Sequence, residues 1–200
     1  MRLTRETIVQ GALQLLNEVG LDDFTTRRLA DRLGIQSPTL YWHFKSKREL
    51  LDAMAYAMLK DLDARPLPAP GSDWRAFWLE NTRAFRRALL AHRDGARVHA
   101  GTLPSVSQLP RAEMLMRLLC SEGFAPEKAL AIMLTVSRFV VGWVLEEQAA
   151  GSRADESQSA FNPSPESFPL LAEAAQLMKN QGPDWAFDLA LSFLLGSDSN

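Results

Sequence analysis

Residues 25–47, TTRRLADRLGIQSPTLYWHFKSK, contain the side chains of this sequence that are best suited to binding chemistry. Thr39, Tyr41, Trp42 and His43 place a hydroxyl group, aromatic rings and an imidazole on about two turns of helix. Such groups can contact phosphates and the edges of bases. The alternative is three packed helices that bind no nucleic acid, and Trp42 alone is weak evidence against it because tryptophan usually lies in a core or an interface.

Two short helices separated by a turn must position these groups. Thr25 is a candidate cap for the first helix, and Gly34 supplies the turn that lets a second helix cross the first. Ser37 is expected to cap the second helix, with Pro38 at its first position, where a missing N–H costs nothing. The spacing therefore predicts a helix-turn-helix.

Composition limits the classes of protein that this chain can represent. It has 200 residues, 46% of them hydrophobic, and a formal net charge of -2. The charge is unevenly distributed, since residues 1–48 carry a net +3 and the remainder -5. Cys120 is the only cysteine, which excludes an intramolecular disulfide framework. The first residues lack a signal-peptide pattern and no uninterrupted run of 18 apolar residues occurs, so we expect a soluble cytoplasmic protein that does not interact with membranes.

The remainder of the chain is predicted to be helical, without strands or repeats. The apolar spacing and the capping residues predict further helices at 4–19, 47–63, 74–91, 107–122, 126–149, 167–179 and 184–195. Prolines and a glycine between residues 66 and 71 interrupt this pattern. We therefore expect an all-α fold of about ten helices, with one domain at 1–63 and a second at 72–200.

Three features of the second domain need an explanation. Asn81 lies on the apolar face of its helix, where a polar group needs a partner. The helix at 126–149 is apolar on nearly every side, so its own domain or a second subunit must cover it. His99 stands in a weakly helical segment between glycines, where a lone histidine is usually just a surface or hydrogen-bonded residue.

An enzyme is not indicated. The chain has three histidines and one cysteine, and it lacks the P-loop, G-x-S-x-G and H-E-x-x-H motifs. Glu146 and Glu147 are adjacent on one helix and point in different directions, which favours interface or metal-binding roles over an acid and base pair.

The order of these elements resembles a known family. TTRRLADRLGIQSPTLYWHFKSKRELLDAM is similar to the DNA-binding domain of TetR-family transcriptional regulators. ALQLLNEVG, RRALLAHRDGARVHAGT and VVGWVLEEQ extend the resemblance to the C-terminal domain of the tetracycline repressors within that family. It implies a homodimeric repressor that binds a palindromic operator through two recognition helices and is released by a small-molecule effector.

The resemblance also implies DNA contacts. Arg27 is the candidate for a bidentate bond to guanine, because its guanidinium matches the O6 and N7 acceptors. The positions placed for contact with bases or phosphates are Thr26, Arg27, Ser37, Pro38, Thr39, Tyr41, Trp42, His43 and Lys47. Ser37 replaces the glutamine found in the tetracycline repressors, so we expect a different operator preference.

A ligand site is implied on the same basis. The corresponding positions are Asp63, Asn81, Phe85, His99, Thr102, Leu103, Leu115 and Arg138. No cofactor is expected to be obligatory, but Mg²⁺ could arrive as a chelate with the effector, and His99, Thr102 and Glu146 stand at the positions that would hold it. Glu146 would act in the site of the other subunit.

Several of these positions lack the polar group that grips tetracycline in the family. Asp63 and Arg138 replace histidines, Leu103 replaces an arginine, Leu115 replaces a glutamine, and Trp143 replaces a small residue. The effector is therefore either tetracycline or another small molecule, such as a different planar chelator, that controls an efflux or modification gene. A DNA-binding homodimer without an effector is the third reading. Release is expected to depend on how residues 95–102 meet the helix at 47–63.

Overall fold

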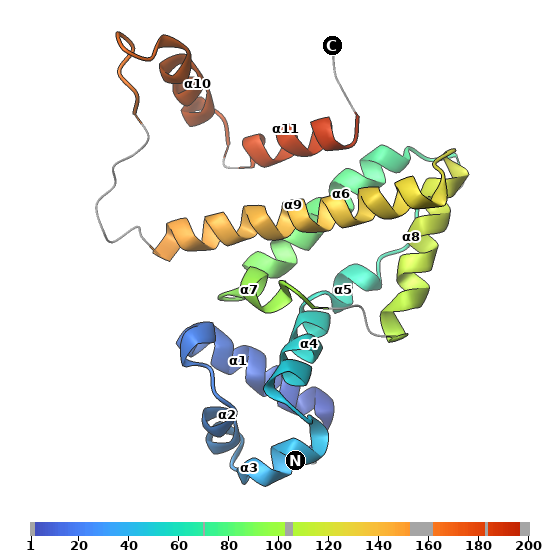
Figure 1. Ribbon diagram of the computed structural model, residues 1–200, viewed down its shortest axis with the longest axis vertical. Coiled ribbons are helices and arrows are strands. Elements are labelled where there is room, and N and C mark those ends of the chain that lie inside the picture. Colours follow the sequence, from blue (N-terminus) through green and yellow to red (C-terminus); the bar gives the residue numbers. More distant parts are fainter. Residues whose placement is uncertain (1–2, 70, 103–105, 153–161, 183, 197–200) are drawn as a thin grey trace. The chain divides into compact units, whose positions relative to one another are not determined.

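The computed structural model describes residues 3–69, 71–102, 106–152, 162–182 and 184–196, with Ser107 and Ser152 described by their backbone alone. The chain forms two compact units, residues 1–148 and 149–200, and each is considered by itself. Helices and loops account for all of the described residues, and no strand occurs among them (Figure 1). The predicted all-α fold is confirmed.

The first unit contains the helices from α1 to α8 and most of α9, which ends beyond Gln148 (Figure 1). They are α1 (Arg5–Asp23), α2 (Thr26–Leu33), α3 (Ser37–His43), α4 (Lys47–Met58), α5 (Lys60–Asp63), α6 (Trp74–Leu90), α7 (Gly95–His99), the 3-10 turn η1 (Val106–Gln108), α8 (Leu109–Ser121) and α9 (Pro126–Ser152).

Local capping explains where the first helices begin and end. The Thr25 hydroxyl accepts a bond from the Arg28 amide at 3.1 Å, and Gly34 ends α2 in the left-handed conformation at φ +65, as expected. The predicted start of α3 was wrong by one residue. Gln36 is the N-cap residue, so Ser37 lies inside the first turn and no side chain caps this helix. Because Pro38 needs no amide partner there, the helix tolerates the missing cap.

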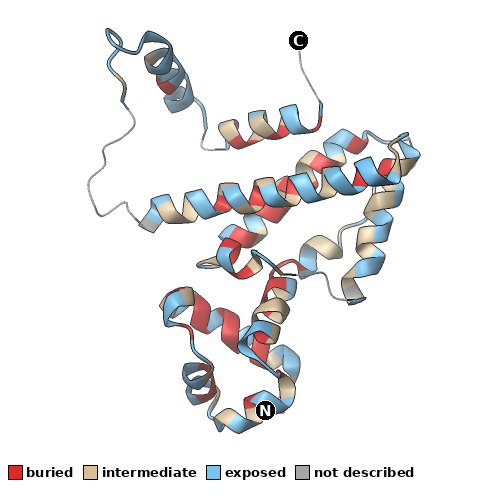
Figure 2. Ribbon diagram, viewed as in Figure 1, coloured by how far each residue is buried: buried red, intermediate tan, exposed pale blue. Residues whose placement is uncertain are grey.

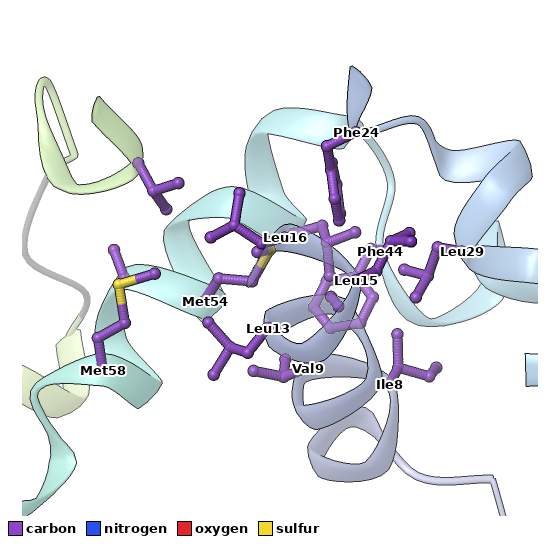
Figure 3. Close-up of a cluster of buried hydrophobic side chains, with 14 of the residues drawn as sticks. Ile8, Val9, Leu13, Leu15, Leu16, Phe24, Leu29, Phe44, Met54 and Met58 are labelled. Carbon is purple, nitrogen blue, oxygen red and sulfur yellow. The ribbon is translucent and has the colours of Figure 1, made fainter. Parts of the chain in front are cut away.

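A buried apolar cluster joins α1, α2, α3 and α4 (Figure 3). Its largest fully buried members in these helices and their connections include Phe24, Leu29, Leu40 and Phe44. Val98 of α7 completes the cluster from outside these helices. The core of the helix-turn-helix region therefore extends to α7.

The predicted helix at 47–63 is two helices. Leu59, at φ -101 and ψ 2, interrupts the helical backbone between α4 and α5. Ser46 caps α4 by accepting from the Glu49 amide at 3.1 Å, and the Glu49 carboxylate accepts from Lys45 N at 2.8 Å, one residue before the cap. The buried side chains of Met58 and Leu59 hold the break against the core.

Helix α9 is buried on one side only. Val136, Val140 and Val144 form its buried stripe, while Leu130 and Leu134 are exposed (Figure 2). Residues Pro126–Gly151 meet the length and hydropathy criteria for a membrane-spanning helix, which core helices of soluble proteins also meet. Arg138 and Glu146 interrupt this segment, so the expectation that no uninterrupted run of 18 apolar residues occurs still holds.

The second unit contains α10 (Pro169–Asn180) and α11 (Trp185–Leu194). Its buried residues include Ala175, Phe187 and Leu191. Both helices begin and end within two residues of the predicted ranges. The predicted domains, 1–63 and 72–200, divide the chain elsewhere than these compact units and stay a prediction.

Candidate functional site

Helices α2 and α3 present an exposed polar and aromatic surface. The side chain of Trp42 is 86% exposed and that of Tyr41 is 49% exposed, although tryptophan is normally buried. Arg27 and Pro38 are also exposed, whereas Ser37 and Thr39 are half-buried. Two aromatic rings of α3 are therefore exposed to solvent, while the opposite side of this helix enters the core through Leu40.

Hydrogen bonds fix the edges of this surface. The Tyr41 hydroxyl lies 3.3 Å from Thr26 Oγ1, which links α3 to α2. Lys47 Nζ donates to the Phe24 carbonyl at 2.7 Å, so this ammonium group is tied to the end of α1. His43 is half-buried, and its carbonyl accepts from the Arg5 guanidinium.

The arginines of α2 differ in their partners. Arg28 pairs with Asp23 at 3.7 Å, and Arg32 pairs with Glu18 at 2.6 Å. Within the described residues the Arg27 guanidinium has neither an ion pair nor a hydrogen bond. Within the described part of α2, Arg27 is therefore the arginine without a protein partner, and its contact with guanine stays a prediction.

A second set of candidate residues lies between α6 and α7. The rings of Phe85 and His99 meet edge to face, with centroids 5.2 Å apart. Asn81 lies one turn before Phe85 on α6, is 9% exposed, and has a buried Oδ1 atom without a hydrogen-bond partner. The Nδ1 atom of His99 is likewise buried and unpartnered. Burial lowers the pKa of His99, so the imidazole is predominantly neutral near pH 7.

A small cavity of about 190 Å³ adjoins His99. Thr102 lines it and donates from its hydroxyl to the His99 carbonyl at 2.8 Å. The other lining residues come from α4, η1 and α9: Asp52, Ala55, Tyr56, Gln108, Leu134 and Ser137. The structure thus brings His99, Thr102 and Phe85 together, as the resemblance implied.

The remaining predicted ligand positions are placed differently. Leu115 is half-buried on α8, whereas Arg138 and Glu146 are exposed on α9. Asp63 is half-buried at the end of α5, and burial raises the pKa of its carboxyl group. Leu103 lies outside the described residues. Neither Arg138 nor Glu146 lines the cavity beside His99 in this chain, so their roles stay predictions.

The connection between the two sites is polar as well as apolar. The Asp94 carboxylate accepts from the Leu21 amide at 2.8 Å, and Arg97 makes two bonds to the Asp22 carboxylate at 2.6 and 3.0 Å. A β-carbon on Gly20 would lie 2.9 Å from Arg93, and one on Gly95 would lie 2.2 Å from the Leu89 carbonyl. Gly20 allows the turn before α7 to approach α1 closely, and Gly95 allows the start of α7 to approach the end of α6.

Helix α4 also meets this segment. Arg48 donates to the Gly101 carbonyl at 2.5 Å, and Val98 packs in the same cluster as Met54 and Met58. The contact between residues 95–102 and α4, expected from sequence, is therefore present. The polar bonds from Asp94 and Arg97 to α1 were not foreseen, because no local pattern pairs residues so far apart in the chain.

Sequence reasoning also missed several charged groups. Arg86, 9% exposed, holds the Glu147 carboxylate through two bonds of 3.0 and 2.6 Å, and Trp143 Nε1 donates to the same carboxylate at 3.0 Å. Glu147 is thus a structural partner rather than a metal ligand. Arg111 of α8 has a buried Nη2 atom without a partner. The sequence pattern around Arg86 and Arg111 predicted neither the ion pair nor the buried atom, because arginines are common on helices that are only partly apolar.

Two family models match the chain. Residues 8–54 match the bacterial regulatory proteins of the tetR family, and residues 67–196 match the tetracyclin repressor-like C-terminal domain. The first match contains α2 and α3, and the second contains the residues around Phe85 and His99.

Individual relatives agree over nearly the whole chain. The tetracycline repressor protein class A from transposon 1721 of Escherichia coli is 48% identical over 194 residues, covering 97% of this chain and 89% of the relative. A TetR variant from Acinetobacter baumannii AYE in complex with minocycline superimposes with a TM-score of 0.80 at 46% identity, covering 98% of this chain and 92% of the other. TetR class A with 5a,6-anhydrotetracycline and magnesium gives 0.76 at 42% identity, with 98% and 97% covered. The chain therefore belongs to the TetR family of bacterial transcriptional regulators.

Proposed function

We propose that this protein is a homodimeric transcriptional repressor that binds a palindromic operator and leaves it when a small-molecule effector binds between α6 and α7. The observation that carries the proposal is the surface of α3, whose aromatic side chains are exposed on a helix that is anchored by the buried Leu40. Such a helix can enter the major groove while its opposite side stays packed.

The homodimer accounts for the apolar surface of α9. Leu130, Leu134 and Leu145 are exposed on this helix, and a second copy would cover them. A two-fold dimer would present two copies of α3, about 34 to 36 Å apart, to successive major grooves. The operator is then a palindrome. The protein would act in the cytoplasm, where the DNA is.

The unpartnered atoms between α6 and α7 support an effector site. Asn81 Oδ1 and His99 Nδ1 are buried without hydrogen bonds within the described chain, and an unpaired buried polar group costs roughly 1 to 3 kcal/mol. A ligand that donates to Asn81 and shares a proton or a metal with His99 would remove that cost. Binding would therefore be favoured at this site.

The contacts of α7 suggest how binding reaches the DNA. Residues 94–102 carry His99 and Thr102, and this segment contacts Arg48 of α4 through the Gly101 carbonyl and contacts α1 through Asp94 and Arg97. A ligand that shifts α7 must therefore shift the helices that hold α2 and α3. Switching the operator from mostly bound to mostly free requires about a 10⁴-fold preference of the ligand for the released state.

Magnesium would enter with the effector. His99 offers a neutral, unpartnered nitrogen, which is the form of imidazole that binds metals. The described part of the chain contains no group of three His, Cys, Asp or Glu side chains able to hold a metal. A chelating effector would supply oxygen ligands, with Thr102 and the Glu146 of the second copy placed to bind through water.

Operator binding and its reversal test the proposal. Purified protein is mixed with fluorescent palindromic DNA from upstream of its own gene and of the neighbouring genes, and anisotropy is recorded. Minocycline and anhydrotetracycline are then added with and without Mg²⁺. We expect nanomolar binding to one of these DNAs and a return to the free anisotropy with drug and Mg²⁺. Binding that does not exceed that of random DNA would refute the repressor function.

Release by another compound is the second candidate. Asp63, Leu115 and Arg138 lack the polar groups expected for tetracycline, and a pocket deprived of such groups discriminates weakly between ligands of similar shape. Operator binding that persists at high micromolar minocycline and Mg²⁺ would exclude the tetracycline effector and leave this candidate.

A further inference from the structure

The end of α3 is held by a side chain from α1. Arg5 donates from its guanidinium to the carbonyl of His43, the last residue of α3, and the last carbonyls of a helix find no donor within it. A positive group at that end also interacts favourably with the helix dipole. The guanidinium lies over the Phe44 ring as well, with Cζ 4.1 Å from the ring centroid. Arg5 therefore contacts both the last residue of α3 and the residue that follows it.

The same guanidinium connects α3 to the beginning of α4. Arg5 Nη2 donates to Glu49 Oε1 at 3.0 Å, and Glu49 Oε2 accepts from the Lys45 amide at 2.8 Å. Lys45 lies in the connection between α3 and α4, and Glu49 lies in the first turn of α4. One arginine and one carboxylate thus join the start of α1, the end of α3 and the start of α4.

The backbone that carries Arg5 is itself stabilised. Arg5 is the first residue of α1 and directly follows the cap residue Thr4. The Thr4 hydroxyl accepts from the Thr7 amide at 3.2 Å, and the Thr7 hydroxyl accepts from the Thr4 amide at 2.9 Å. This reciprocal cap stabilises the first turn of α1, from which the guanidinium extends.

Helix α3 needs such support because it is short. It has 7 residues, whereas isolated helices of fewer than about 12 residues are marginal in water. Leu40 anchors the middle of the helix in the core, and no side chain caps its beginning. A helix held at its middle can still tilt, and a tilt would move the exposed rings of Tyr41 and Trp42. The contacts of Arg5 at the end of α3 oppose that tilt.

We propose that Arg5 is a positioning residue for operator recognition: it orients α3 through His43, Phe44 and Glu49 and reads no base itself. Sequence-specific contacts require the recognition helix in one orientation, whereas binding to random DNA depends mainly on charge. Loss of the Arg5 contacts should therefore reduce affinity for the operator more than affinity for random DNA. This inference rests on the proposed function and adds a residue outside the predicted DNA-contact positions.

Variants of the full-length protein test this inference: Arg5→Gln, Arg5→Lys, Glu49→Ala and the matched control Arg32→Gln. Arg32 also pairs with a carboxylate of α1, but its partners, Glu18 at 2.6 Å and Gln14 at 3.4 Å, both lie on α1. Dissociation constants for the operator bound by the wild type and for random DNA are measured by anisotropy at several salt concentrations. Circular dichroism at the assay temperature verifies that each variant is folded.

We expect Arg5→Gln to weaken operator binding roughly tenfold, as loss of hydrogen bonds to charged groups does, and to change binding of random DNA by less than about twofold. Arg5→Lys should recover only part of this loss, because an ammonium group cannot reproduce the fork of a guanidinium. Glu49→Ala should weaken operator binding about threefold or more, although removal of a negative charge would by itself strengthen the attraction to DNA. Arg32→Gln should stay within about twofold of the wild type on both DNAs, because exposed ion pairs contribute little.

Four results would overturn the proposal: unchanged operator binding in Arg5→Gln, equal losses on operator and random DNA, stronger operator binding by Glu49→Ala, or an equal loss in Arg32→Gln. Equal losses on both DNAs, with a weaker dependence on salt, would show that Arg5 contacts a phosphate directly. Failure of the repressor function is seen separately, because the wild type alone would then bind no operator more tightly than random DNA.

Discussion

The region of α1 to α4 and the region of α6 to α9 satisfy their buried groups differently. In the first, an apolar cluster that includes Leu29, Leu40 and Phe44 fills the interior. In the second, the described residues include buried polar atoms without partners, on Trp78, Asn81, His92, His99 and Arg111. A closed apolar core holds the exposed residues of α3 in place. Buried polar atoms without partners lower the free energy of unfolding, and a ligand that forms hydrogen bonds with them would raise it again.

The candidate binding groups therefore lie on the outer surface in the first region and in the interior in the second. Among the described residues of the first region, Asp52 Oδ1 is the buried polar side-chain atom that lacks a hydrogen bond, and it forms an ion pair with Arg48. The residues proposed to contact DNA, among them Arg27, Tyr41 and Trp42, lie on the outer surface of this region. The effector region offers its chemistry inside, through Asn81 and His99. We therefore expect that substitutions which destabilise the first region abolish DNA binding through loss of structure. Substitutions in the second region should instead alter the response to ligands.

Removing a core ring should have the largest effect. Phe44 is 2% exposed and contacts the Arg5 guanidinium, so Phe44→Ala should lower the free energy of unfolding by about 3 to 5 kcal/mol. Trp42→Ala, at a side chain 86% exposed, should change it by less than about 0.5 kcal/mol while weakening operator binding. Urea unfolding followed by circular dichroism measures both. Similar decreases in the free energy of unfolding for the two variants would contradict the assignment of Phe44 to the core and of Trp42 to the surface.

Separating Arg86 from Glu147 should have the next largest effect. Glu147→Gln removes one negative charge that is held by a nearly buried guanidinium and should cost about 2 to 3 kcal/mol. The cost falls below that of a fully buried pair because the Glu147 side chain is 28% exposed. The control is Glu146→Gln, on the exposed neighbour, which should alter the Mg²⁺-dependent response and not stability. Loss of stability in the control alone would reverse the assignment of the two carboxylates.

Truncating Arg27 tests whether the outer surface reads bases. Arg27→Ala should weaken binding to the operator by about 1 to 3 kcal/mol and relax specificity at one base pair. Arg28→Ala should weaken it less, because Asp23 already occupies that guanidinium. Anisotropy titrations on operator variants measure the change. An equal loss on random DNA would show that Arg27 touches phosphate only.

The smallest expected effect is on the pH dependence of stability. Burial lowers the pKa of His99 below the ordinary value of 6.5, so its stabilising contribution is complete above about pH 6.5 and is lost as the pH falls below it. Asp52 lines the same cavity, but it pairs with Arg48 at 3.0 Å.

His99→Gln should therefore flatten the stability profile between pH 7 and 5, measured by thermal unfolding in buffers of equal ionic strength. His43→Gln, in the DNA-reading region, is the comparison variant. An unchanged slope in His99→Gln would show that protonation of this imidazole costs nothing in the folded state.

The sequence predicted the DNA-reading region more fully than the effector region. Thr25, Gly34 and Pro38 act locally, through capping, a left-handed turn and a fixed φ, so their spacing alone predicts two crossed helices. The family resemblance added the grouping of Phe85, His99 and Thr102, which the structure brings together. The sequence could not reveal that α4 ends at Met58 or that Gln36 occupies the N-cap position of α3, because packing decides such boundaries.

What the sequence alone determined is the all-α fold and the helix-turn-helix, since periodicity, caps and turns depend on residues a few positions apart. What only the tertiary structure decided is which charges meet. Arg97 pairs with Asp22 and Arg86 pairs with Glu147, although long stretches of chain separate the members of each pair. The Nη2 atom of Arg111 has no hydrogen-bond partner among the described residues. Electrostatic pairing acts through space over a few ångströms, and only the folded chain sets those distances.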